Sequence, residues 1–293
     1  MPSVLKSIRE NLKKIPFLQK IIILLRGCIF PPKPIPIPPE NHCFPSGFVE
    51  INDQFVQKNW EHLRVGYDEE SYIKESIQLI RSHTMVSYHG LASLASQIKY
   101  LKDNNISGSV VETGTCMGGS AALMAMFCQH YFKEKPTFYL FDSWCGLPQP
   151  QKKDYMDFMD KNWGITEQEC NGCLVPTGAL EASQQDTEDA MFKLANYPKD
   201  KVHFYKGWFQ DTVPQASKSI GNIALLRLDG DLYESTKVCL EHLYPLVNPG
   251  GIIVIDDWCL KGCRMACEEF FEQIGIKPLV HHVDVCTHYI IKN

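Results

Sequence analysis

Two short apolar runs, at 223–228 and 252–255, stand out in the hydrophobic pattern of the chain. Both runs contain β-branched residues and are bounded by turn or acidic residues, which is typical of buried strands in a parallel sheet. Between them, residues 235–247 carry apolar side chains at helical spacing, and the Pro-Gly-Gly sequence at 249–251 ends that helix. The pattern therefore predicts a β-α-β unit of ~30 residues, the usual length of such a crossover.

The remainder of the chain after about residue 50 alternates in the same way between apolar runs and helical patterns. Further parallel strands are predicted at 108–113, 137–141 and 202–205, and a closing antiparallel pair at 279–283 and 286–291. Helices are predicted at 67–82, 87–102, 121–131, 187–196 and 262–274, with Ser87 as the N-cap of the second. This order predicts an α/β fold with an open, mostly parallel sheet between helices. The polar stretch at 147–198 is predicted to be an insertion over the carboxyl edge of the sheet.

Residues 1–40 differ in composition from the rest of the chain. Six basic residues and one acid fall within the first thirty positions, and the apolar run at 21–25 is far shorter than the ~20 residues of a membrane span. Prolines at 31–39 predict a stiff spacer. We therefore expect a basic helix and linker at 1–40, a helical cap at 41–105 and the main α/β domain at 106–293. The basic helix is interpreted either as a contact to a membrane surface or as a contact within a homo-oligomer.

Acidic residues follow both strands of the central unit directly. Asp229 and Asp231 come after the first strand, and Asp256 and Asp257 come after the second. Neighbouring strands lie ~4.8 Å apart, and open α/β sheets bind ligands at the carboxyl ends of their strands. A set of carboxylates suits Mg²⁺, Mn²⁺ or Ca²⁺ rather than Zn²⁺. Because the acids would repel one another without a cation, we favour a metal site over a set of helix caps and solvated loop acids.

A second candidate site follows the strand predicted at 108–113. There the sequence reads E-T-G-T-C-M-G-G-S from Glu112 to Ser120, and a strand, glycine turn and helix in this order form the opening of a nucleotide-binding sheet. The spacing differs from the G-x-G-x-x-G of dinucleotide sites, and glycines at such turns also serve packing alone. Asp142, at the end of the next strand, is placed to accept hydrogen bonds from ribose hydroxyls or, alternatively, to cap a loop.

Composition and charge narrow the class of protein. With 293 residues, 44% hydrophobic and 22% charged, the chain is typical of a soluble globular protein. The net charge of −5, with no basic stripe in the body of the chain, argues against a nucleic-acid partner. Twelve cysteines in a chain of this size indicate reduced thiols in the cytoplasm rather than a disulfide scaffold. Cys259, Cys263 and Cys267 fall at helical spacing on one face, which favours half-buried thiols over a metal site.

Taken together, these motifs resemble the macrocin O-methyltransferase family of S-adenosylmethionine enzymes, which modify the sugars of macrolides, aminocoumarins and other natural products. The resemblance covers roughly residues 72–271 and leaves residues 1–50 outside. It rests on T-M-V-S at 84–87, V-E-T-G-T-C-M-G-G-S-A-A-L-M-A at 111–125, F-D-S-W-C-G-L-P at 141–148, K-G-W-F-Q-D-T at 206–212, L-D-G-D-L-Y-E-S-T-K-V at 228–238 and P-G-G-I-I-V-I-D-D-W at 249–258.

The resemblance implies a class I methyltransferase sheet of seven strands with the last one antiparallel, after an N-terminal helical extension. It implies Mg²⁺ or Mn²⁺ on Asp229, Asp256 and Asp257, with Asp231 as the catalytic base. The S-adenosylmethionine site that it implies consists of Met85, Glu112, Gly114, Thr115, Gly118, Ser120, Asp142, Ser143, Asp211 and Asp229.

The activity implied is metal-dependent transfer of a methyl group from S-adenosylmethionine to a hydroxyl of a sugar, natural product or glycan. Three alternatives stay open on the residues alone. A nicotinamide oxidoreductase is disfavoured by the missing G-x-G-x-x-G. A hydroxylase-like member of the same fold would retain the same carboxylates. A non-catalytic binding module on this fold is disfavoured because it would not need to keep them.

Overall fold

The computed structural model of the protein describes residues 70–156, 166–167 and 170–293. The predicted basic helix and proline linker, the first part of the cap and the start of the helix predicted at 67–82 lie outside the described residues. In the part of the chain that is described, no helix combines the length and the apolar character that crossing a bilayer requires.

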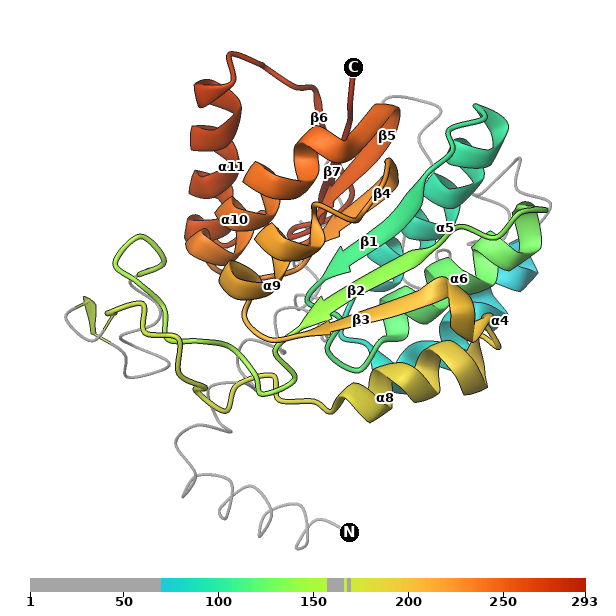
Figure 1. Ribbon diagram of the computed structural model, residues 1–293, viewed down its shortest axis with the longest axis horizontal. Helices are drawn as coiled ribbons and strands as arrows, with labels where there is room; N and C mark the ends of the chain where they lie inside the picture. Colours follow the sequence, from blue (N-terminus) through green and yellow to red (C-terminus); the bar gives the residue numbers. More distant parts are fainter. Residues whose placement is uncertain (1–69, 157–165, 168–169) are drawn as a thin grey trace, which may run out of the picture.

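A seven-stranded sheet forms the centre of the molecule, with the strand order β3-β2-β1-β4-β5-β7-β6 (Figure 1). Strands β1 to β5 run parallel, and β7 runs antiparallel to both of its neighbours. Seven mostly parallel strands with an antiparallel last strand were predicted, whereas the order of the strands in the sheet was not. The strands are β1 Ser109–Thr113, β2 Phe138–Asp142, β3 Val202–Lys206, β4 Ile223–Leu228, β5 Val247–Ile255, β6 Val280–His282 and β7 His288–Ile291.

Helices cover both faces of the sheet, and each face has its own apolar core (Figure 1). One layer consists of α4 Glu70–Ile80, α5 Tyr88–Asp103, α6 Gly119–Tyr131 and α8 Gln184–Asp189, which continues into a π-helical turn at Ala190–Leu194. The other layer consists of α9 Phe209–Ala216, α10 Tyr233–Leu243 and α11 Lys261–Gln273. Short 3₁₀ turns lie at Arg81–His83, Lys199–Lys201 and Tyr244–Leu246. The sheet is therefore buried on both faces, as its apolar strands require.

Most predicted elements are present, with three differences. Helix α9 was not predicted, because it has only eight residues and contains Pro214, which usually marks the end of a helix. Helix α8 begins earlier than predicted, where Ser183 and Asp186 form a reciprocal capping box. The Pro-Gly-Gly at 249–251 lies inside β5 rather than between a helix and a strand, and the register between β4 and β5 shifts beside it. None of these differences moves the carboxyl edge of the sheet, where the predicted site lies.

Candidate active site

The backbone carries the acidic residues from the ends of β4 and β5 to one place. The amide of Asp229 donates to the carbonyl of Thr113 at 2.9 Å, and the amide of Asp256 donates to the carbonyl of Leu228 at 2.9 Å. The ladder between β1, β4 and β5 thus continues one residue past the strands. It places Asp229 beside the glycine turn after β1 and beside Asp256.

Three of the predicted acids form a compact cluster. Carboxylate oxygens of Asp229, Asp256 and Asp257 all lie within 4.8 Å of one another, a spacing suited to a shared metal ion. Asp231 joins them through its backbone, because its amide donates to Asp257 Oδ2 at 2.9 Å. Its φ of 59° lies in the left-handed region, which aspartate tolerates better than most residues. The structure therefore brings together all four acids that the strand ends predicted.

The carboxyl groups of Asp231, Asp256 and Asp257 have pKa values above those of exposed aspartates. Burial, followed by repulsion from Asp229 and Asp256, raises the pKa of Asp231 to about 8. Burial also raises the pKa of Asp256 to about 6, even though Arg227 lowers it. The pKa of Asp257 is raised by burial and by the neighbouring aspartates. A divalent cation would relieve this repulsion, so the donor set fits a hard cation.

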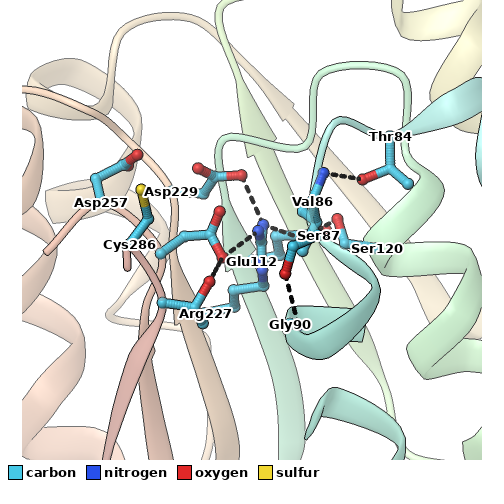
Figure 2. A network of polar contacts seen from close by, with 12 residues as sticks. Thr84, Val86, Ser87, Gly90, Glu112, Ser120, Arg227, Asp229, Asp257 and Cys286 are labelled. Carbon is cyan, nitrogen blue, oxygen red and sulfur yellow. Dashed lines mark hydrogen bonds and ion pairs between the residues drawn. The ribbon is translucent and has the colours of Figure 1, made fainter. Parts of the chain in front are cut away.

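Arg227 links the acidic cluster to Glu112 in the predicted cofactor site (Figure 2). It lies in β4 and is fully buried. Its Nη1 lies 2.8 Å from Glu112 Oε1 and 2.7 Å from Asp229 Oδ2, and its Nη2 lies 2.9 Å from Asp256 Oδ1. Burial alone would lower the pKa of the guanidinium, but the three carboxylates outweigh it and raise the pKa. Arg227 was not among the predicted site residues, although a single charge within an apolar strand was the signal that could have identified it.

Glu112 and Ser120 form the buried floor of the predicted cofactor site. Ser120 Oγ donates to Glu112 Oε1 at 2.6 Å from the first turn of α6. Burial raises the pKa of Glu112, and the charge of Arg227 partly offsets this effect. Glu112 Oε2 and the hydroxyl of Thr115 are buried with no hydrogen-bond partner among the described residues. Because buried polar atoms are rarely left unpaired, these two atoms are available to a polar ligand in the turn.

The glycine turn after β1 packs closely against the backbone of Asp229 in the acidic cluster. Gly114 has a φ of +91°, and a Cβ at this position would lie 1.6 Å from the carbonyl oxygen of Asp229, so only glycine fits. Gly118, with a φ of +81°, is the N-cap of α6. Asp142 holds the outer side of the turn, because its carboxylate accepts from the amides of Cys116 and Trp144, both at 2.7 Å. The predicted turn residues are therefore packed into one loop system above β1 and β2.

The T-M-V-S segment closes the same loop system from the other side. Thr84 and His83 pack against Gly119, where a Cβ would come within 2.8 Å of the Thr84 side chain. Ser87 caps α5 by accepting from the amide of Gly90 at 2.9 Å, as predicted. Met85 lies between these contacts with 38% of its surface exposed, so its side chain is accessible to a ligand.

Two predicted residues remain, of which Ser143 belongs to this arrangement through its amide, which donates to the carboxylate of Asp142. The hydroxyl of Ser143 donates to the carbonyl of Gly146 at 2.8 Å and so shapes its own loop. Asp211 lies in the first turn of α9 and is exposed. The assignment of these and the other predicted residues to the cofactor site stays a prediction.

The insertion is attached to the loop before α10 through Asp154, a contact that was not predicted from the sequence. Asp154 Oδ1 accepts from the amide of Tyr233, the first residue of α10, at 2.7 Å. Its Oδ2 accepts from the amide of Gln151 at 2.9 Å. The helix that follows Asp231 is therefore capped by a residue from the insertion, whose loops project from the carboxyl end of the sheet (Figure 1).

Comparison with known proteins identifies the family to which these features belong. The family model described as Macrocin-O-methyltransferase (TylF) matches residues 45–292. The chain is 32% identical over 204 residues to the 8-demethyl-8-(2,3-dimethoxy-alpha-L-rhamnosyl)-tetracenomycin-C 4'-O-methyltransferase of Streptomyces olivaceus, covering 69% of this chain and 73% of that protein. It is 31% identical over 203 residues to the mycinamicin III 3''-O-methyltransferase of Micromonospora griseorubida, covering 69% and 76%.

The fold is also similar to that of a solved structure of this kind. The O-methyltransferase NovP matches with a TM-score of 0.64 and 25% identity, over 77% of this chain and 100% of NovP. This similarity confirms the predicted fold class. The chain therefore belongs to the macrocin O-methyltransferase family, as its motifs predicted, and is an O-methyltransferase.

Proposed function

We propose that the protein transfers a methyl group from S-adenosylmethionine to a hydroxyl of a sugar or of a related natural-product or glycan acceptor, with Mg²⁺ or Mn²⁺ at the acidic cluster. The observation that carries the proposal is the position of the acidic cluster directly beside the glycine turn. Asp229 contacts Gly114 through its backbone and Arg227 through its carboxylate. A cofactor in the turn and an acceptor at the cluster would therefore be neighbours.

The class of acceptor is inferred from the relatives. One acts at the 4' position of a rhamnosyl tetracenomycin, and another at the 3'' position of mycinamicin III. A third, from Streptomyces niveus, is a demethyldecarbamoylnovobiocin O-methyltransferase with 29% identity over 233 residues. The acceptor named in the first is a rhamnosyl compound, so a sugar hydroxyl is the acceptor that we propose here. The protein is also expected to form a homo-oligomer and to lie in the cytoplasm.

Each group of residues would have a separate task. Glu112 and Thr115 would bind polar groups of S-adenosylmethionine through their unpaired atoms in the turn. Ser120 would hold Glu112 in position within the same site, and Asp142 would accept from the ribose of the cofactor. Asp229, Asp256 and Asp257 would hold the divalent cation, which lowers the pKa of the acceptor hydroxyl when bound. Asp231 would accept the hydroxyl proton, because a cation-bound hydroxyl needs only a modest acceptor.

Calorimetric titration separates this function from the alternatives on the same fold. S-adenosylmethionine, NADH and 2-oxoglutarate are each titrated into the protein, with and without Mg²⁺. The proposal expects binding of S-adenosylmethionine alone among the three. Binding of 2-oxoglutarate would favour hydroxylase-like chemistry, and binding of NADH would favour an oxidoreductase.

Replacing Asp142 by alanine is expected to weaken S-adenosylmethionine binding by ~1–3 kcal/mol, because the amides of Cys116 and Trp144 lose their acceptor and the turn loses its support. Calorimetry measures the change in Kd. Asp200→Ala, an exposed acid in the turn before β3, is the control and is expected to leave the Kd unchanged. An unchanged Kd for Asp142→Ala would place the cofactor elsewhere.

The roles of Asp231 and Asp229 are expected to separate in asparagine variants. Asp231→Asn is expected to keep Mg²⁺ and S-adenosylmethionine affinity but to lower the single-turnover rate by ~10²-fold or more, the typical loss of general-base help. Asp229→Asn is expected to weaken Mg²⁺ binding first. Metal titration and single-turnover kinetics on both variants check this. If Asp231→Asn loses the metal but keeps its rate at saturating Mg²⁺, the two roles are reversed.

The domain boundaries are proposed as predicted: a helix and linker at 1–40, a cap at 41–105 and the methyltransferase domain at 106–293. The start of the family match at residue 45 supports the first boundary. The basic helix, whether it contacts a membrane surface or another copy of the chain, lies outside the described residues.

A further inference from the structure

Two cysteines that are distant in the sequence meet beside the acidic cluster. Cys259 follows β5 in the loop that carries Asp256 and Asp257, and Cys286 lies in the turn between β6 and β7. Their Sγ atoms are 2.7 Å apart. The spacing of Cys259, Cys263 and Cys267 predicted one helical face, but α11 begins only at Lys261. Cys259 therefore precedes the helix and faces Cys286 instead.

The two loops are already held together around this pair. The amide of Trp258 donates to the carbonyl of Cys286 at 3.0 Å. Thr287 Oγ1 donates to Asp256 Oδ1 at 3.1 Å, and Asp284 Oδ1 accepts from the amides of Cys286 and Thr287. Figure 2 draws Cys286 together with Asp257 and the Arg227 network. The backbone on both sides is thus fixed in the position that brings the sulfurs together.

We propose that Cys259 and Cys286 are the site of a reversible disulfide that locks the loop carrying Asp256 and Asp257 against the β6–β7 turn. An S–S bond is ~2.05 Å long, so the sulfurs need to approach by only about 0.7 Å. Both thiols are half-buried, whereas Cys263 and Cys267 in α11 are buried. The site is therefore both preformed and accessible to a small oxidant, and its existence depends on neither the cofactor nor the cation.

The oxidant is a low-molecular-weight disulfide, such as oxidised glutathione. The thiolate of one cysteine attacks a sulfur of the oxidant, which forms a mixed disulfide and releases one thiolate. The second cysteine, as its thiolate, then attacks the protein sulfur of the mixed disulfide and releases the second small thiolate, and the two released thiolates take up the two protons that the cysteines lost. Two protein thiols are oxidised, one small disulfide is reduced to two thiols, and a dithiol reagent reverses the reaction.

Peptide mapping of the folded full-length protein tests the proposal. The protein is treated with oxidised glutathione, remaining thiols are alkylated, and the digest is analysed without reduction. We expect a peptide that joins Cys259 to Cys286 and that disappears after dithiothreitol. The same treatment is expected to raise the melting temperature by roughly 5–10 °C, because the bond closes a loop with a sequence separation of 27 residues.

Three variants complete the experiment. Cys259→Ser and Cys286→Ser are each expected to abolish both the cross-linked peptide and the rise in melting temperature. Cys173→Ser removes an exposed thiol and is expected to preserve both effects. Separate glutathione adducts on Cys259 and Cys286, or a link from either one to a different cysteine, would overturn the proposal. A rise in melting temperature that persists in Cys259→Ser would overturn it as well.

Discussion

Replacing Asp257 by alanine is expected to lower Mg²⁺-dependent methyl transfer by well over ~10²-fold. The loss of a residue that only hydrogen-bonds to a metal ligand costs less than this. Asp257 is the best of the three acids for this test. The guanidinium of Arg227 pairs with Asp229 and Asp256, so the Asp257 variant leaves those ion pairs in place. S-adenosylmethionine affinity is expected to stay close to that of the unaltered protein, because Glu112 and Ser120 keep their contacts.

Calorimetric titration of Mg²⁺ and of S-adenosylmethionine, together with turnover, measures the three quantities separately. Asp200→Ala serves again as the control for the loss of one exposed carboxylate. Full activity of the unaltered protein in excess EDTA would contradict the metal-assisted mechanism. An unchanged Mg²⁺ affinity in Asp257→Ala would show that the cation binds without this ligand.

The acidic cluster was predictable because the features that form it are local. Each strand is marked by its own apolar run, and Asp229 and Asp256 directly follow the runs. Once two adjacent strands are parallel, their carboxyl ends lie at the same edge of the sheet, and the hydrogen bonds between the strands place Asp229 beside Asp256. The same local signals, an apolar run followed by a glycine turn, located Glu112, Gly114 and Gly118. The order of elements was therefore sufficient for the fold class and for the positions of the acidic cluster and the glycine turn.

The unpredicted parts of the site depend on contacts between distant residues. Glu112 and Arg227 are 115 residues apart, and a charge in an apolar strand carries no indication of its partner. Asp154 reaches Tyr233 from the irregular insertion. Asp231 was predicted from its place just after a strand, but the sequence does not show how its side chain is directed. Because β4 ends at Leu228, alternation along the strand does not position Asp231, and a turn with positive φ does so instead.

Replacing Arg227 by methionine is expected to destabilise the folded protein by ~3–5 kcal/mol, the usual cost of removing one member of a buried ion pair. Methionine fills much of the same volume, so the cost comes from the charge rather than from a cavity. The fully buried Glu112 would lose its only ion-pair partner among the described residues. Asp229 and Asp256 would lose the charge that offsets their mutual repulsion. Urea unfolding at neutral pH measures the difference in free energy of unfolding.

Two further variants show whether the guanidinium acts through these carboxylates. Lys193→Met removes an exposed pair with Asp189 at 2.6 Å and is expected to cost less than ~1 kcal/mol. The double variant Glu112→Gln with Arg227→Met is expected to recover part of the loss, because it removes the buried unpaired charge.

If Arg227→Met alone stays within ~1 kcal/mol of the unaltered protein, Arg227 is not what neutralises the acids. Mg²⁺ is then expected to stabilise Arg227→Met no more than the unaltered protein. If the guanidinium does neutralise them, Mg²⁺ stabilises the variant more, since the cation takes over the missing positive charge.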